Sequence, residues 1–243
     1  MSVAQRPAFY ALQTGGWRDY VTLLHPPYTL WHLSYVAIGA ALAPDLSVER
    51  LVWGLLAFLL ALGFGAHALD ELNGRPLQTS IPDRVLVAIA AVSIGGAAAI
   101  GIVAAVAWTA WLLPFVAFGT FIVVAYNLEL FGGRFHSDAW FVLAWGAFPV
   151  LTAYVGAAGT LRPVALLAAG FAACTSLAQR ALSTQVRAVR RRATSVEGAI
   201  TYEGAAPEQI TAETLVRAPE AALRAMTLAV VLLAATLLVL RLA

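Results

Sequence analysis

The feature that most constrains this chain is a series of long stretches that contain no Asp, Glu or Arg residue. They cover residues 20–44, 51–69, 85–128, 139–161, 163–179 and 225–240. A helix needs roughly 20 mostly apolar residues to cross the hydrocarbon of a membrane. Only 12% of the 243 residues are charged, against about 25% in a typical soluble domain. The sequence therefore predicts an all-α integral membrane protein.

The stretch of residues 85–128 is long enough for two helices, and Trp108 and Trp111 near its middle are typical of a turn at the membrane interface. The count is therefore about seven transmembrane helices, arranged as a compact bundle. Along the chain we expect an N-terminal interfacial segment at residues 1–19, a six-helix membrane core at 20–186, a cytoplasmic loop at 187–224 and a C-terminal transmembrane helix at 225–243.

The arginines predict the orientation, because short cytoplasmic loops of membrane proteins are enriched in positive charge. All 15 basic residues are arginines, and all but Arg50, Arg162 and Arg241 fall on the side of the N-terminus. We therefore expect a multi-pass protein of the cell membrane with a cytoplasmic N-terminus. The net charge of +2 calls for no nucleic-acid partner, and the arginine run at residues 190–192 can contact anionic membrane lipids.

Polar residues gather at the predicted cytoplasmic ends of the helices. His67, Asp70 and Glu71 stand at i, i+3 and i+4, so they share one face of a continuing helix. His25 and His32 lie at the same membrane side, and we interpret them as structural. Other candidates at this side are Asn73, Arg75, Tyr126, Asn127, Glu129, Arg134, His136, Asp138 and Arg180. Ionisable groups so close to hydrocarbon are costly unless they face a polar cavity or bind a ligand.

Carboxylates and arginines in one pocket suit an anion that is bridged by a metal ion. Acidic side chains hold hard cations such as Mg²⁺, which binds oxygen ligands together with substrate phosphates. Arginines contact phosphate oxygens, often through two parallel hydrogen bonds. The polar cluster therefore predicts a phosphate-binding site at the cytoplasmic membrane face.

At these residues the sequence resembles the UbiA superfamily of intramembrane prenyltransferases. The run His67-Ala-Leu-Asp-Glu-Leu-Asn-Gly-Arg-Pro-Leu77 is similar to the family's Asp-rich motif after the second helix, which often continues into Arg-Pro-Leu. Tyr126-Asn-Leu-Glu129, followed by Arg134, resembles the family's tyrosine and basic residues after helix four. The resemblance covers about residues 20–160. It implies an all-helical bundle with an active site at the cytoplasmic side.

The resemblance also implies a Mg²⁺-dependent transfer from a prenyl diphosphate. Asp70 and Glu71 would hold the Mg²⁺ ion, and Asn73 or Glu129 would complete its ligand shell. Tyr126 would shield an allylic cation by a cation–π contact. The residues expected to bind diphosphate or substrate are Asn73, Arg75, Asn127, Arg134 and Arg180.

The chain also departs from this family, and two alternatives stay open. The family's second Asp-rich motif, expected after helix six, is absent, and residues 179–187 hold no acid there. One alternative is a lipid-modifying metalloenzyme that holds iron or zinc, because imidazole with carboxylate favours such metals. Its ligands would come from His67, Asp70, Glu71, Glu129, His136 and Asp138. The other is a non-catalytic lipid-handling protein on the same scaffold.

Overall fold

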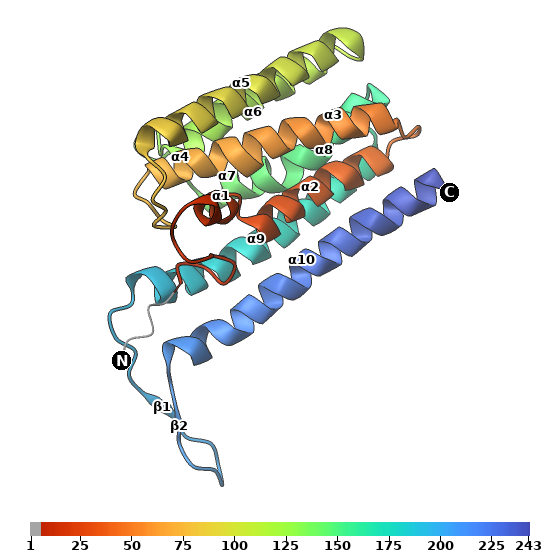
Figure 1. The fold of residues 1–243 in the computed structure, drawn as a ribbon. Coiled ribbons are helices and arrows are strands. Elements are labelled where there is room, and N and C mark those ends of the chain that lie inside the picture. Colours follow the sequence, from red (N-terminus) through yellow and green to blue (C-terminus); the bar gives the residue numbers. More distant parts are fainter. Residues whose placement is uncertain (1–5) are drawn as a thin grey trace.

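The computed structural model describes residues 6–243 as a bundle of long helices whose axes are roughly aligned (Figure 1). The helices are α1 (Trp17–Leu23), α2 (Pro26–Ala41), α3 (Val48–Phe58), α4 (His67–Leu72), α5 (Asp83–Ala107), α6 (Leu112–Asn127), α7 (Asp138–Phe141), α8 (Phe148–Ala158), α9 (Pro163–Arg192) and α10 (Ala212–Leu242). The π-helical segments η1 (Leu59–Ala66) and η2 (Val142–Ala147) join α3 to α4 and α7 to α8. A short hairpin pairs β1 (Ala199–Ile200) with β2 (Glu208–Gln209).

The prediction of a mainly helical chain is confirmed, and the structure contains helices that could cross a membrane. Five helical segments are long and apolar enough to cross a membrane, namely Val48–Leu72, Asp83–Ala107, Asp138–Ala158, Pro163–Arg192 and Ala212–Leu242. Helices α2 and α6 have 16 residues each, which is slightly short for a straight crossing. The turn predicted around Trp108 is also confirmed, because α5 ends just before it and α6 begins at Leu112.

The segment between the last two helices is shorter than the loop predicted at residues 187–224. Helix α9 continues to Arg192 and α10 begins at Ala212, so only residues 193–211 connect them. Arginine and alanine are strong helix formers, which explains why α9 continues through the arginine run. Thr211 begins α10 with a capping box formed together with Thr214. Residues 1–5 of the predicted N-terminal segment lie outside the described residues.

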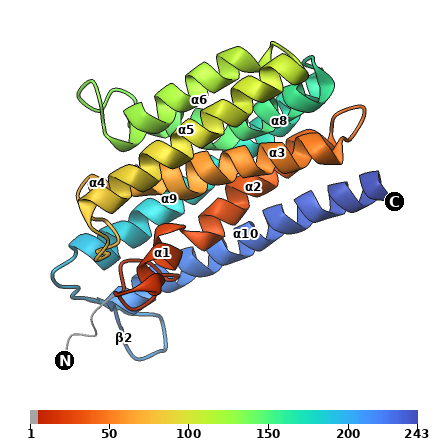
Figure 2. The ribbon, with the colours of Figure 1, turned by 45° about the horizontal axis from the view of Figure 1, so that its top comes forward.

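Helix α2 lies in the middle of the bundle, between α8 and α10. Helices α5 and α6 lie on the side of the bundle opposite α10 (Figure 2). Trp31 and Tyr35 of α2 are fully buried. The Tyr35 hydroxyl contacts α9, where Thr175 Oγ1 lies 2.6 Å away. Since a buried tyrosine hydroxyl needs a hydrogen-bond partner, this contact fixes α2 against α9.

Gly39 marks the closest approach of α2 and α8. A Cβ atom at this position would lie 2.3 Å from the backbone oxygen of Val150, so the two helices touch through backbone. We expect Gly39→Ala to lower the free energy of unfolding by about 1–3 kcal/mol, because the helices must separate to admit the methyl group. Thermal unfolding in detergent micelles measures this loss.

Gly95→Ala in α5 is the matched control, because a Cβ there meets nothing within 4 Å. This substitution should be neutral or stabilising by about 0.5–1 kcal/mol, since alanine loses less entropy than glycine when a helix forms. Equal unfolding temperatures for both variants would contradict the close packing of α2 on α8.

Successive long helices alternate in direction, so their ends gather at two opposite ends of the bundle. One end, which we call the cavity end, collects the beginnings of α2, α5, α7 and α10 and the endings of α4, α6 and α9 (Figure 1). The hairpin β1–β2 also lies at this end, and the C-terminus lies at the opposite end. The fold therefore brings polar residues from distant parts of the sequence together.

Candidate functional site

A cavity of about 430 Å³ opens at the cavity end. Its wall is built by α2, α4, α7, η2, α9, the end of α6, the segment after α6 and residues 7–10. All four histidines of the chain line it, namely His25, His32, His67 and His136. Binding pockets typically measure roughly 300–1,000 Å³, so this space is large enough for a polar ligand group.

Three of the histidines have their Nδ1 atom fixed by a backbone carbonyl. The carbonyl of Trp145 lies 2.8 Å from His32 Nδ1, and that of Gly63 lies 3.1 Å from His67 Nδ1. His136 makes the equivalent contact to Tyr126 at 3.1 Å. A carbonyl only accepts hydrogen bonds, so each Nδ1 carries the hydrogen. In the neutral ring, Nε2 is then the acceptor nitrogen.

The π-helical segments position two of these histidines. Gly63 belongs to η1 and Trp145 belongs to η2, and each supplies the carbonyl that a histidine binds. Segments of π-helix are often found at functional sites. They distort the regular backbone pattern, so the carbonyl groups point where a straight α-helix would not place them. Here the distortion fixes the rings of His32 and His67 beside the cavity.

His25 and His67 form a stacked pair in the cavity wall. Their ring centroids are 4.0 Å apart and their planes differ by 13°. The Tyr10 hydroxyl lies 2.7 Å from His25 Nδ1, while His25 Nε2 is buried without a hydrogen-bond partner among the described residues. Burial, together with His67 and nearby arginines, holds the pKa of His25 well below its ordinary value. The ring is therefore uncharged at neutral pH.

Arginines of α9 form the opposite wall. Arg180, Arg187 and Arg191 line the cavity together with Thr184. Their spacing of four, three and four residues keeps them on one face of the helix. Arg180 donates to the Tyr126 hydroxyl at 2.5 Å, and it forms an ion pair with Asp138. The guanidinium group of Arg180 also lies over the Phe141 ring, 5.0 Å from its centroid.

Residues 7–10 cover the cavity on its outer side. Arg191 Nε donates to the Pro7 carbonyl at 3.1 Å, and Arg224 of α10 lies over the Phe9 ring at 4.9 Å. Tyr10 packs edge-on against Tyr28, with 5.6 Å between the ring centroids. The N-terminal segment is thus held by α9, α10 and α2 together.

The structure brings about half of the sequence-predicted residues to this cavity. Those that line it are His67, Asp70, Tyr126, Asn127, His136 and Arg180. The predicted residues outside its lining are Glu71, Asn73, Arg75, Glu129, Arg134 and Asp138. The boundary falls within the His67–Leu77 motif itself, since Asp70 faces the cavity and its neighbour Glu71 does not.

Glu71 and Arg75 organise the loop that follows α4. Glu71 is 1% exposed, and its carboxylate accepts backbone N–H groups of Leu77 at 2.9 Å and Thr79 at 2.8 Å. Arg75 donates to the Ile81 carbonyl at 2.6 Å and pairs with Asp83 at the start of α5. Their charged groups are therefore engaged within the loop.

Asp19 ties the same loop to α1. Its carboxylate accepts the Gly15 backbone N–H at 2.9 Å, the Ser80 backbone N–H at 2.9 Å and the Ser80 hydroxyl at 2.5 Å. Burial raises the pKa of this carboxyl, but the hydrogen bonds outweigh that effect and hold it below the ordinary value. The ionised Asp19 thus links α1 to the loop that follows α4.

The remaining predicted residues lie outside the cavity lining. Asn73 donates to the Asn127 carbonyl at 3.1 Å. Glu129 has its carboxylate 3.8 Å from His136 Nδ1, and Arg134 is exposed. Within residues 6–243, no three His, Cys, Asp or Glu side chains are grouped closely enough to hold a metal ion.

Several cavity residues were not singled out as site residues from the sequence. These are Tyr10, Gln179, Arg187 and Arg191. The regular spacing of Thr184, Arg187 and Arg191 behind Arg180 was the available signal, because it places their side chains on one helix face. No local pattern marks Tyr10, which reaches the cavity only because residues 7–10 fold back over it.

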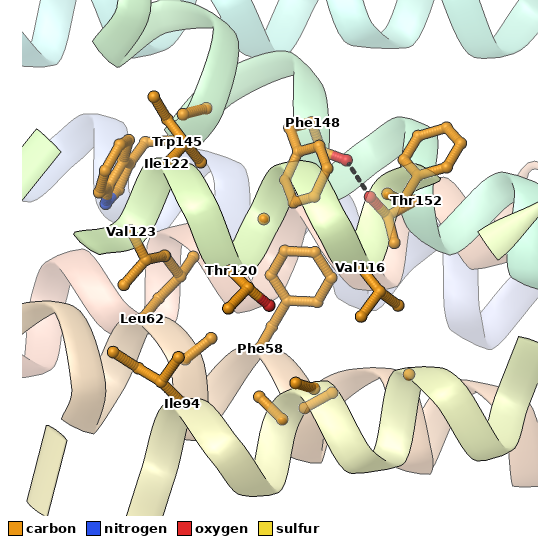
Figure 3. A pocket seen from close by; sticks show the side chains of 18 residues that line it. Phe58, Leu62, Ile94, Val116, Thr120, Ile122, Val123, Trp145, Phe148 and Thr152 are labelled. Carbon is orange, nitrogen blue, oxygen red and sulfur yellow. Dashed lines mark hydrogen bonds between the residues drawn. The ribbon is translucent and has the colours of Figure 1, made fainter. Parts of the chain in front are cut away.

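A second, apolar pocket adjoins the polar cavity. It measures about 100 Å³ and lies between α3, η1, α5, α6, η2 and α8. Figure 3 shows Phe58, Leu62 and Val123 around this space, with Trp145 at one side. Trp145 lines both the apolar pocket and the polar cavity. The charged cavity and the apolar pocket therefore share one lining side chain.

Comparisons with known proteins identify no relative for this chain, because no protein family, curated protein or solved structure matches it.

Proposed function

We propose that this chain is a prenyltransferase-like membrane enzyme that binds a prenyl diphosphate at the cavity end. In this proposal it crosses the cell membrane about seven times, with the cavity end in the cytoplasm. The main support for this proposal is that an arginine-lined cavity and an apolar pocket share the lining residue Trp145. An anionic amphiphile needs both environments side by side.

The arginines of α9 supply the binding energy for the diphosphate. Arg180, Arg187 and Arg191 face the cavity, and guanidinium groups bind phosphate oxygens by charge-assisted hydrogen bonds. Asp70 is the single carboxylate among the lining residues, so positive charge dominates the wall. Such a wall attracts a diphosphate and stabilises the negative charge that develops on it as a leaving group.

The apolar pocket, at about 100 Å³, receives the part of the prenyl chain next to the diphosphate, since an apolar cavity of about 150 Å³ holds a molecule of the size of benzene. Its lining is almost entirely aliphatic and aromatic, with Thr120 and Thr152 as the polar exceptions. The Thr152 hydroxyl donates to the Phe148 carbonyl at 2.8 Å (Figure 3), so it offers no free donor to the pocket. Aromatic rings mark the junction, where the centroids of Tyr126 and Trp145 are 4.4 Å apart. Electron-rich ring faces can shield an allylic cation there.

The proposed step is a substitution at the allylic carbon C1. The bond between C1 and the diphosphate oxygen breaks, and its electron pair leaves with the diphosphate that Arg180, Arg187 and Arg191 hold. The nucleophilic atom of an acceptor forms the new bond to C1. The proton that the acceptor loses passes to the carboxylate of Asp70. The aromatic rings beside Trp145 exclude water from the reacting carbon.

The Mg²⁺ ion expected from the family resemblance has few ligands here. It usually binds through one or two carboxylates together with substrate phosphates. Glu71 is engaged with its loop, and the cavity lining offers only Asp70. Asp70 alone could therefore hold a Mg²⁺ ion only together with the diphosphate, and residues 6–243 contain no group of three His, Cys, Asp or Glu side chains that would hold iron or zinc. In this proposal the arginines neutralise the diphosphate.

Equilibrium binding to the full chain in lipid nanodiscs tests the proposal. The probes are farnesyl thiodiphosphate, whose C–S bond resists ionisation, farnesol and inorganic diphosphate. The thiodiphosphate should bind at least ~100-fold more tightly than farnesol, since two charge-assisted hydrogen bonds supply about 3 kcal/mol. It should also bind more tightly than inorganic diphosphate, which lacks the apolar part.

Magnesium forms the second arm of this experiment. If the arginines carry the charge, removing Mg²⁺ with a chelator changes the thiodiphosphate affinity less than tenfold. Equal binding of farnesol and the thiodiphosphate would overturn the proposal. If the thiodiphosphate binds, but natural farnesyl diphosphate releases no diphosphate with any lipid extract as acceptor, the result favours the non-catalytic lipid-handling alternative.

A further inference from the structure

The cavity lining contains hydrogen-bond acceptors as well as arginines. Gln179 of α9 is 3% exposed, and its Oε1 atom is buried without a partner among the described residues. Buried polar atoms are almost always hydrogen-bonded, so an exception points to a ligand or another function. Gln179 lines the cavity together with the Asp70 carboxylate.

The histidines add two more acceptors. His32 and His67 each commit Nδ1–H to a backbone carbonyl, which leaves Nε2 as the acceptor nitrogen of the neutral ring. Both residues line the same cavity as Gln179. The acceptors therefore come from three different elements, α2, α4 and α9, and surround one space.

From these contacts we infer that the cavity holds a second subsite, formed by His32, His67, Asp70 and Gln179, which binds the hydroxyl groups of a polyol headgroup. The inference rests on the proposed function in treating the cavity as a substrate site, and it names the chemical class of the second substrate. A single hydroxyl donates only one hydrogen bond. Filling acceptors from three elements therefore requires a ligand with several hydroxyl groups.

Charge selects the polyol over a cationic ligand. An ammonium group also donates several hydrogen bonds, but Arg180, Arg187 and Arg191 line the same cavity. These charges repel a cation that enters the same cavity. A neutral polyol meets no such repulsion, and it leaves the arginines free for the diphosphate. The two wall chemistries thus match two different substrates.

A pair of matched probes tests the subsite. We expect n-hexyl β-D-glucoside to bind the full chain in nanodiscs at least tenfold more tightly than its fully O-methylated derivative, which keeps the ring and loses every donor. Hexylammonium should bind more weakly than the glucoside. Equal affinity for the glucoside and the methylated derivative, or tighter binding of hexylammonium, would overturn the inference.

Substitution of Gln179 tests whether this residue binds the glucoside, and the unfolding temperature distinguishes a lost contact from misfolding. Gln179→Leu should abolish the preference for the glucoside and also raise the unfolding temperature of the ligand-free protein, because it removes a buried unpaired acceptor. A variant that simply misfolds would unfold at a lower temperature. Gln185→Leu, which makes the same change at an exposed position of α9 outside the cavity lining, should keep the preference. An unchanged preference in Gln179→Leu removes this residue from the site.

Farnesyl thiodiphosphate binding is measured on the same samples. If the glucoside preference is present and the thiodiphosphate does not bind, the proposed prenyltransferase function fails and the polyol subsite stands. If the thiodiphosphate binds and the glucoside preference is absent, the subsite fails and the proposed function stands.

Discussion

Replacing both Arg187 and Arg191 with glutamine is expected to weaken binding of farnesyl thiodiphosphate by at least ~100-fold. Each residue faces the cavity from the same side of α9. A hydrogen bond to a charged group contributes about 1.5–3 kcal/mol, and a tenfold change in affinity corresponds to about 1.4 kcal/mol. Two lost contacts therefore remove about 3 kcal/mol or more. Glutamine keeps much of the side-chain length, so the effect reports charge.

The matched control changes the same net charge at the same end of the molecule. Arg18 in α1 and Arg84 in the first turn of α5 are exposed and lie outside the cavity lining. Their double glutamine variant should bind the thiodiphosphate within about threefold of the unchanged protein, because exposed charges are screened beyond about 8–10 Å at physiological salt. Equal losses in both double variants would mean that the basic surface attracts the ligand and the cavity does not.

Much of the fold followed from the apolar pattern of the sequence. The long stretches without Asp, Glu or Arg gave the helices, because such segments can satisfy backbone polar groups in lipid only by forming helices. The paired tryptophans correctly marked the turn between α5 and α6. The extent of the last connection was harder to predict. The arginine run at residues 190–192 is polar enough for a loop, yet it continues α9, since arginine also favours helix.

The candidate site was only partly predictable, and the His67–Leu77 motif shows why. Spacing placed His67, Asp70 and Glu71 on one helix face. The two carboxylates nevertheless diverge, because Glu71 turns to the backbone N–H groups of the loop that follows. Residues on one helix face can still point in different directions. Sequence spacing does not reveal which hydrogen-bond donors a later loop will place next to one of them. Arg75 likewise donates to the Ile81 carbonyl of this loop and does not line the cavity.

Contacts between distant segments were beyond any local pattern. Tyr10 meets His25 across 15 residues, and Arg191 meets Pro7 across 184 residues. Neither contact leaves a periodic trace in the sequence. The stacked histidines arise similarly, since His25 precedes α2 and His67 follows η1. The apolar pattern placed all four histidines at one membrane side, and the tertiary structure brings them into the lining of one cavity.

The buried ion pair between α9 and α10 controls how the last helix is attached to the bundle. Arg190 donates to Glu220 through Nε at 2.5 Å and through Nη2 at 3.0 Å. Glu220 is 4% exposed. Next to it, Val216 and Leu223 of α10 are buried against Val186 of α9. Removing one member of such a pair leaves an uncompensated charge in a space that water reaches poorly.

Glu220→Ala is therefore expected to lower the free energy of unfolding by about 3–5 kcal/mol, measured in detergent by thermal or denaturant unfolding. Glu213→Ala is the control, because its carboxylate is 72% exposed and 3.9 Å from Arg190, and exposed pairs contribute only about 0–1 kcal/mol. The double variant Arg190→Met/Glu220→Leu should recover most of the loss, since an apolar pair leaves no buried charge. If the double variant is as unstable as Glu220→Ala, lost packing explains the effect and the unpaired Arg190 charge does not.

Trypsin provides a second measurement, because loosening α10 should expose Arg217 and Arg224 to cleavage earlier in Glu220→Ala than in the double variant.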